Sequence, residues 1–150
     1  MTAAIKASNA KSPFRYGNPT VDCDGAQIRA QCRQLATVVT ISGEVCDGNV
    51  DDLIERMRHY ILPEKSVIVD LGEVRSFAAP CVSLIRAVDD MCNAADVEWS
   101  LVASQPVMWA LRRGDQTTVA LAASVPEALH QFSDVMSQRR QLLPLLGKSA

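Results

Sequence analysis

The chain is built around the segment Ser66-Val-Ile-Val-Asp-Leu-Gly-Glu-Val-Arg-Ser-Phe-Ala-Ala-Pro-Cys-Val-Ser-Leu-Ile-Arg-Ala87. It opens with Ser66–Leu71, a short apolar run of the kind that is buried on both faces in a parallel sheet. We expect a turn after this run and then a helix that begins near Pro80, because proline fits the first helical turn, where the missing amide would have no partner. The predicted core face of this helix comprises Cys81, Leu84, Ile85, Val88 and Cys92.

Two strands and a helix are predicted on the amino-terminal side of this segment. Apolar and polar residues alternate in Ala26–Arg33, and Thr37–Gly43 is rich in β-branched side chains, so we expect two strands that pair antiparallel. Asp47-Gly-Asn49 then interrupts the pattern. An amphipathic helix follows and stops before Pro63, with its apolar face at Val50, Leu53, Ile54, Met57 and Ile61.

Strands and helices continue to alternate on the carboxyl-terminal side. We expect a strand at Val97–Ala103, a short helix from Ser104 to about Gly114 and a last short strand at Thr117–Leu121. A final helix follows the capping-box spacing of Ser124-Val-Pro-Glu127, and its predicted core face is Val125, Leu129, Phe132 and Met136. This alternation predicts an α/β fold, with a mixed sheet of four or five strands and helices packed against it.

The composition is that of a globular protein without a polyanionic partner. The 150 residues suffice for one domain, 48% of them are hydrophobic and 21% are charged, and the formal net charge of -2 argues against a nucleic-acid-binding surface. No apolar run approaches the roughly 18 residues that a membrane span requires, and no apolar core follows the lysines near the N-terminus. We therefore expect a cytoplasmic protein that does not insert into membranes.

The domain boundaries are predicted from changes in composition. Residues 1–24 mix small, polar and basic residues with proline and glycine and lack periodicity, which predicts a flexible N-terminal extension. We place the domain at residues 25–137. Residues 138–150 carry four leucines and are expected to extend the final helix or to form a tail.

No residue pattern indicates a metal, a cofactor or a catalytic centre. The five cysteines form no Cys-x-x-Cys pair, and none shows a zinc-ligand spacing with His59 or His130. Neither histidine stands in a recognisable triad spacing with a nucleophile and an acid. We expect a protein without enzyme activity, bound metal or cofactor.

Two motifs give the chain a resemblance to a known family. Val39-Thr-Ile-Ser-Gly-Glu44 precedes the first predicted helix, and Val67-Ile-Val-Asp-Leu71 precedes the second. In the order and separation of these motifs, from about Ala26 to Phe132, the chain resembles the STAS domain family, which includes sulfate-transporter tails and anti-sigma-factor antagonists. The resemblance implies a STAS-like fold for residues 25–137.

The resemblance also implies where a partner binds and how binding is switched. In bacterial antagonists of this family, the turn after the third strand usually reads Asp-Ser-Ser-Gly, and phosphorylation of its second serine by the partner kinase ends binding to the anti-sigma factor. That turn corresponds here to Ala78-Ala-Pro-Cys81, with Pro80 in the place of the phosphoserine. Proline has no hydroxyl, so we expect no phosphorylation at this position, and Ala79 as the helix N-cap supplies no side-chain oxygen.

We therefore expect a non-catalytic regulator that binds an anti-sigma factor or another regulatory protein and lacks the usual serine switch. The alternatives are a regulatory subunit of a transporter or signalling complex, a homodimer, and a module that binds a small ligand. The surface expected to contact the partner comprises Phe77, Ala78, Ala79, Pro80, Cys81, Ser83, Glu44 and Asp47.

Cys81 and two neighbouring serines have more than one interpretation. Cys81 lies in a predicted first helical turn, where the dipole can lower a thiol pKa, and with Cys46 it would then form a redox-sensitive surface. The alternative is a small apolar residue that faces the core. Ser76 and Ser83 are either substitute phosphorylation sites or partners in local hydrogen bonds.

Two tryptophans and two arginine pairs also have a structural and a binding interpretation. We expect Trp99 and Trp109 to pack in the core, with contact to a partner as the alternative. Arg112-Arg113 and Arg139-Arg140 are expected to be solvated helix ends, although either pair could contact an acidic partner.

Overall fold

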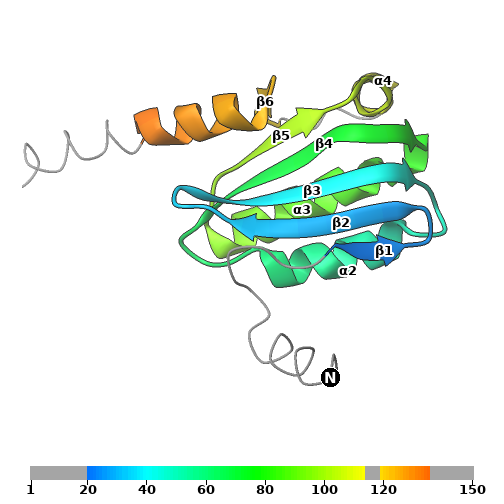
Figure 1. Ribbon diagram of the computed structural model, residues 1–150, viewed down its shortest axis with the longest axis horizontal. Coiled ribbons are helices and arrows are strands. Elements are labelled where there is room, and N and C mark those ends of the chain that lie inside the picture. Colours follow the sequence, from blue (N-terminus) through cyan, green and yellow to red (C-terminus); the bar gives the residue numbers. More distant parts are fainter. Residues whose placement is uncertain (1–19, 114–118, 136–150) are drawn as a thin grey trace, which may run out of the picture.

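The computed structural model describes residues 20–113 and 119–135, which form one six-stranded sheet in the order β1-β2-β3-β4-β5-β6, with helices on both faces (Figure 1). The strands are β1 (Val21–Cys23), β2 (Ala26–Cys32), β3 (Ala36–Val45), β4 (Ser66–Phe77), β5 (Trp99–Ala103) and β6 (Leu121–Ala122). The helices are α2 (Val50–Tyr60), the 3-10 turn η1 (Ala79–Cys81), α3 (Val82–Ala95), α4 (Gln105–Arg113) and a C-terminal helix that includes residues 125–135.

The sheet is mixed, as the sequence predicted, but it has more strands than expected. β1, β2 and β3 pair antiparallel, whereas β3, β4, β5 and β6 pair parallel. The prediction of four or five strands missed β1, which lies inside the segment expected to be a flexible extension and pairs Val21 with Ile28. Three residues are too few to show a periodic pattern, so only the pairing reveals this strand.

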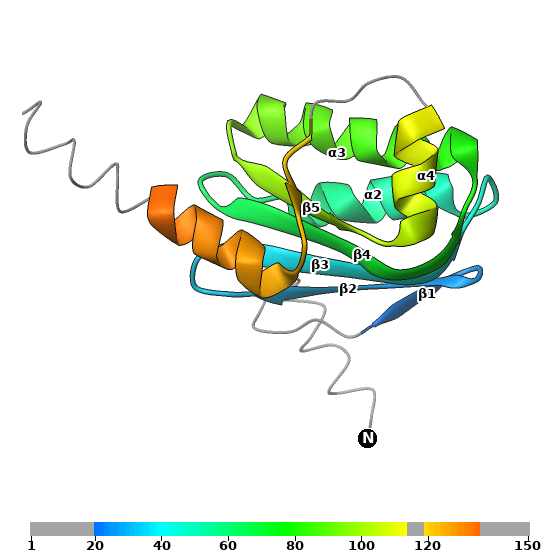
Figure 2. The same ribbon diagram turned by 90° about the horizontal axis from the view of Figure 1, so that it is seen from above.

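The helices cover the two faces of the sheet unequally, as Figure 2 shows. Helices α2 and α3 lie side by side on one face and enclose the main core. Their predicted apolar stripes are confirmed, since Leu53, Met57, Leu84 and Ile85 are at most 1% exposed. The C-terminal helix packs on the opposite face over a second, smaller core, which consists of Ala36, Val38, Ile68, Val102, Ala122, Ala128 and Phe132.

Strand β4 continues through the stretch that we expected to be a turn. Its register with β3 shifts after Asp70 and again after Val74, which marks two β-bulges. Each bulge adds a residue to β4, so the buried positions become Leu71, Val74 and Phe77, three residues apart instead of two. The strand thereby reaches the start of α3 without turning its apolar side chains to solvent.

No helix within residues 20–113 or 119–135 is long and apolar enough to cross a membrane. The predicted residue Met136 and the pair Arg139-Arg140 lie outside the described residues.

Candidate functional site

The carboxyl ends of the parallel strands bring three separate segments to one edge of the sheet. We call this region the carboxyl edge and define it by the β3–α2 loop (residues 44–49), the β4–α3 turn (residues 78–83) and helix α4. It lies on the right in Figure 1, where the arrowheads of β3, β4 and β5 point. Loops at the carboxyl ends of parallel strands are the usual place for binding residues in open α/β sheets.

Asn49 fixes the β3–α2 loop. Its side-chain oxygen accepts a 2.9 Å hydrogen bond from the Cys46 amide, and its side-chain nitrogen donates to the carbonyls of Glu44 at 2.8 Å and Asp24 at 3.1 Å. Only 2% of Asn49 is exposed, so these three bonds replace water around a buried amide. The side chain thus ties the end of β3 to the β1–β2 turn, a role that the Asp47-Gly-Asn49 pattern did not reveal.

Two backbone hydrogen bonds hold the β4–α3 turn. The Ala78 amide donates to the Val45 carbonyl at 3.1 Å, and the Cys81 amide donates to the Ala78 carbonyl at 2.9 Å. Ala78, and not Ala79 as we predicted, is the N-cap, and no side chain caps η1 or α3. Ala79 and Pro80 are exposed, so the tip of this turn presents aliphatic surface without a hydroxyl group.

Cys81 does not have the environment of a reactive thiol. Its side chain is fully buried, and burial raises its pKa, with the negative charge of Asp47 and the thiol of Cys46 adding to the effect. A hydrogen bond with the Ala78 backbone acts in the opposite direction and lowers the pKa, but it is outweighed. The interpretation of Cys81 as a small apolar core residue is the one that this geometry supports, and Cys46 is the exposed cysteine of this edge.

Helix α4 adds a groove beside the turn that the sequence did not reveal. The groove has a volume of about 350 Å³ and runs between the end of β4 (Ser76, Phe77), Ala79 of η1 and the α4 residues Pro106, Trp109 and Arg113. Trp109 is 54% exposed, so the prediction that it packs in the core was wrong, whereas Trp99 is buried as predicted and donates to Asp89 Oδ1 at 3.0 Å. The α4 residues Val107 and Ala110 face the core instead.

The residues predicted to contact a partner do gather at the carboxyl edge, but they are not equally accessible. Phe77 and Cys81 are buried and Ala78 is half-buried, although Phe77 still forms part of the groove wall. The exposed members of the set are Glu44, Asp47, Ala79, Pro80 and Ser83.

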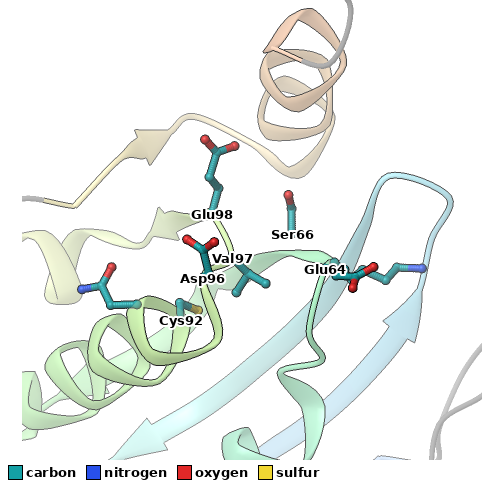
Figure 3. A pocket seen from close by; sticks show the side chains of 8 residues that line it. Glu64, Ser66, Cys92, Asp96, Val97 and Glu98 are labelled. Atoms are coloured by element: carbon teal, nitrogen blue, oxygen red, sulfur yellow. The ribbon is translucent and has the colours of Figure 1, made fainter. Parts of the chain in front are cut away.

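A second pocket, of about 370 Å³, lies at the opposite edge of the sheet (Figure 3). Carboxylates from Glu64, Asp96 and Glu98 surround it, together with Ser66 and Cys92. Within the described residues, no group of three or more His, Cys, Asp or Glu side chains is arranged to hold a metal ion. His59 and His130 are both exposed and lie on different helices, so they do not meet at either edge.

The sequence matches a known domain family and a known protein. It matches the STAS domain over residues 27–113. It is also 42% identical, over 158 residues that cover 100% of both chains, to Osmosensory protein A of Mycobacterium tuberculosis (strain ATCC 25618 / H37Rv). Both matches include the β3–α2 loop, the β4–α3 turn and α4.

Solved structures with similar folds come from proteins of low sequence identity. An anti-sigma factor antagonist from Mycobacterium paratuberculosis superimposes with a TM-score of 0.62 at 16% identity, over 73% of this chain and 96% of that chain. The anti-sigma factor antagonist SpoIIAA in its unphosphorylated form superimposes with a TM-score of 0.59 at 12% identity, over 71% of this chain and 96% of that chain. SLC26A9 superimposes with a TM-score of 0.57 at 11% identity, over 93% of this chain and 27% of that chain. At these identities the likeness concerns the fold alone.

Proposed function

Because the chain belongs to the STAS domain family, we propose that it is a cytoplasmic, non-catalytic regulator that binds another protein, in the manner of an anti-sigma-factor antagonist. The observation that carries this proposal is the exposed aliphatic turn at Ala79 and Pro80, held at the carboxyl edge of the sheet. The family and the fold of two anti-sigma factor antagonists support it. The name of the relative from Mycobacterium tuberculosis suggests a response to osmotic conditions.

The contact surface consists of the exposed residues Ala79, Pro80 and Ser83, with Glu44 and Asp47 beside them. Asn49 and the bond from Ala78 to Val45 hold the supporting loops before any partner arrives. A preformed surface loses little conformational freedom on binding, which favours affinity. Binding would then displace another protein from its complex without chemistry on a substrate.

The turn is not switched by phosphorylation at Pro80. A phosphoserine there would add about 1.5 to 2 negative charges in front of α3 and change the contact surface. Proline keeps the start of the helix and offers no acceptor oxygen for phosphate. Ser76 and Ser83 are exposed and flank the turn. Phosphopeptide mapping of protein treated with the partner kinase shows whether either serine is phosphorylated in place of the family's usual serine.

Affinity purification with the full chain as bait, followed by calorimetric titration of the recovered anti-sigma factor, tests the proposal. Ala79→Glu places a charge on the turn, and we expect it to weaken binding at least tenfold. Ala94→Glu is the matched control, because Ala94 is an exposed alanine at the far end of α3. Equal affinity of the Ala79→Glu variant and the wild type would contradict the proposed surface. Recovery of no sigma regulator would contradict the proposed class of partner.

A second candidate is a regulatory subunit of a transporter or signalling complex. It is favoured by the likeness to SLC26A9, which spans 93% of this chain. In that case the same purification would recover membrane-transport proteins instead of a sigma regulator.

A further inference from the structure

We propose that the groove between β4 and α4 binds an acidic segment of the partner protein, with a large apolar side chain against Trp109 and carboxylates beside Arg75 and Arg113. The inference rests on the proposed function only in that the partner is a protein. It extends the contact surface from the β4–α3 turn, where Ala79 is shared, to helix α4.

Trp109 supplies the apolar contact. Its neighbours Val107 and Ala110 are buried at 0% and 5% exposure, so α4 is already packed against the body and Trp109 projects from it at 54% exposure. The guanidinium carbon of Arg113 lies 5.9 Å from the centre of the Trp109 ring, within the range of a cation–π contact that restrains both side chains. A restrained, exposed tryptophan next to an arginine has the features of an interface hot spot.

The charges at the groove favour a negatively charged partner. Arg75 and Arg113 line the groove, none of its described lining residues is acidic, and Arg112 is exposed on the same last turn of α4. Within residues 20–113 and 119–135, neither Arg75 nor Arg113 has an acidic side chain within ion-pair distance. Among the described residues, therefore, no carboxylate competes with a partner for these two guanidinium groups.

The opposite half of the carboxyl edge orients that partner. Asp24, Glu44 and Asp47 are exposed around the β1–β2 turn and the β3–α2 loop, so this half is acidic whereas the α4 half is basic. An acidic segment would be repelled from the first half and attracted to the second, which fixes its position more than it adds affinity. Ala79 is small and exposed, which leaves room in the groove for the apolar side chain.

Selection of random displayed dodecapeptides on the immobilised full chain tests the inference. We expect enrichment of peptides in which a large apolar residue is flanked by Asp or Glu. A synthetic copy of the best peptide should shift the Trp109 emission to shorter wavelength and protect it from acrylamide quenching. Trp109→Ala and Arg113→Glu should each weaken binding of this peptide at least tenfold. Raised salt concentration should weaken its binding to the wild-type protein. Arg29→Glu is the matched control, because Arg29 is an exposed arginine on β2 away from the groove.

The inference is overturned if no peptide is enriched, if the enriched peptides are basic or uncharged, or if Arg113→Glu binds them as wild type does. Circular dichroism of each variant checks that the fold is kept. The peptide results do not depend on which protein the affinity purification with the full chain recovers. Recovery of a transporter would contradict the proposed function but not the proposal that the groove binds an acidic segment. Enrichment of peptides without acidic residues would contradict the proposal for the groove but not the proposed function.

Discussion

Gly43 lies near the carboxyl edge, at a position where a side chain would not fit. It has a φ of +93°, and a Cβ atom built on it would lie 2.4 Å from the carbonyl oxygen of Gly25. The next residue, Glu44, donates its amide to that same carbonyl at 3.0 Å. The backbone of β3 must therefore pass close to the β1–β2 turn, and only glycine permits both the conformation and the approach.

Gly43→Ala should lower the free energy of unfolding by more than about 2 kcal/mol, because it combines backbone strain with a clash against backbone atoms of Gly25 and Ala26. Gly25→Ala is the control: Gly25 also has a positive φ, but no atom lies within 4 Å of its added Cβ. Urea denaturation of both variants measures the difference. Equal losses in the two variants would mean that the contact with Gly25 is not the cause.

Burial raises the thiol pKa of two cysteines in the main core. Cys81 lies at the start of α3, where the helix dipole would favour a thiolate, yet its pKa is raised. At Cys92, near the end of α3, burial and the negative charge of Asp89 raise the pKa to about 12. Burial is the largest cause in each case. The sequence predicted both cysteines on the core face of this helix, and at Cys81 this burial has a larger effect on the pKa than the position in the first turn.

At the scale of elements, the irregular strand β4 brings the β4–α3 turn to the carboxyl edge. Its first bulge is stabilised by Asp70, whose side-chain oxygen accepts a 2.9 Å hydrogen bond from the Gly72 amide. We expected a turn after Leu71 because the apolar run Ser66–Leu71 ends there. The carboxylate instead satisfies the amide that the bulge leaves unpaired, so pairing with β3 resumes beyond it.

Asp70→Ala should expose the Gly72 amide and weaken the bulge by about 1 kcal/mol, which corresponds to roughly fivefold faster amide exchange at Gly72. Asp22→Ala, on the exposed side of β1, should leave that rate unchanged. Hydrogen exchange followed by NMR measures both. An unchanged Gly72 rate in the Asp70→Ala variant would show that the side chain does not support the bulge.

At the scale of the whole molecule, the sheet separates two cores of different size. The main core lies under α2 and α3, and the smaller core lies under the C-terminal helix. One of the two bonds of the predicted capping box is present, because the Glu127 amide donates to Ser124 Oγ at 3.3 Å. Glu127 Oε1 accepts from the Ala123 amide at 3.0 Å, one residue before the expected donor. The packing of the C-terminal helix depends on a few side chains, of which Phe132 is the largest.

Phe132→Ala should lower the free energy of unfolding by about 3 kcal/mol, since it removes a buried ring and leaves a cavity in the smaller core. Gln131→Ala, exposed on the same helix, should change it by less than about 0.5 kcal/mol. Urea denaturation gives the two values, and limited proteolysis locates the weakened segment. A comparable loss in both variants would show that the ring does not hold this helix to the sheet.

The order and type of most elements could be predicted from the sequence, because apolar periodicity and turn residues act within a few positions of one another. The sequence predicted the antiparallel pair β2–β3 and the helices from α2 to α4. The family resemblance implied that residues 44–47 and 78–83 belong to one surface. The motif order from Val39 to Leu71 also placed the chain in the STAS domain family.

The contacts between segments that are distant in sequence could not be predicted from the sequence. Trp109 projects from α4, and the Asn49 side chain donates a hydrogen bond to the distant Asp24 carbonyl. A local pattern states which face of an element is apolar, but not which distant segment covers it. The groove forms between the end of β4 and helix α4, which are about 30 residues apart in sequence and come together only in the folded protein.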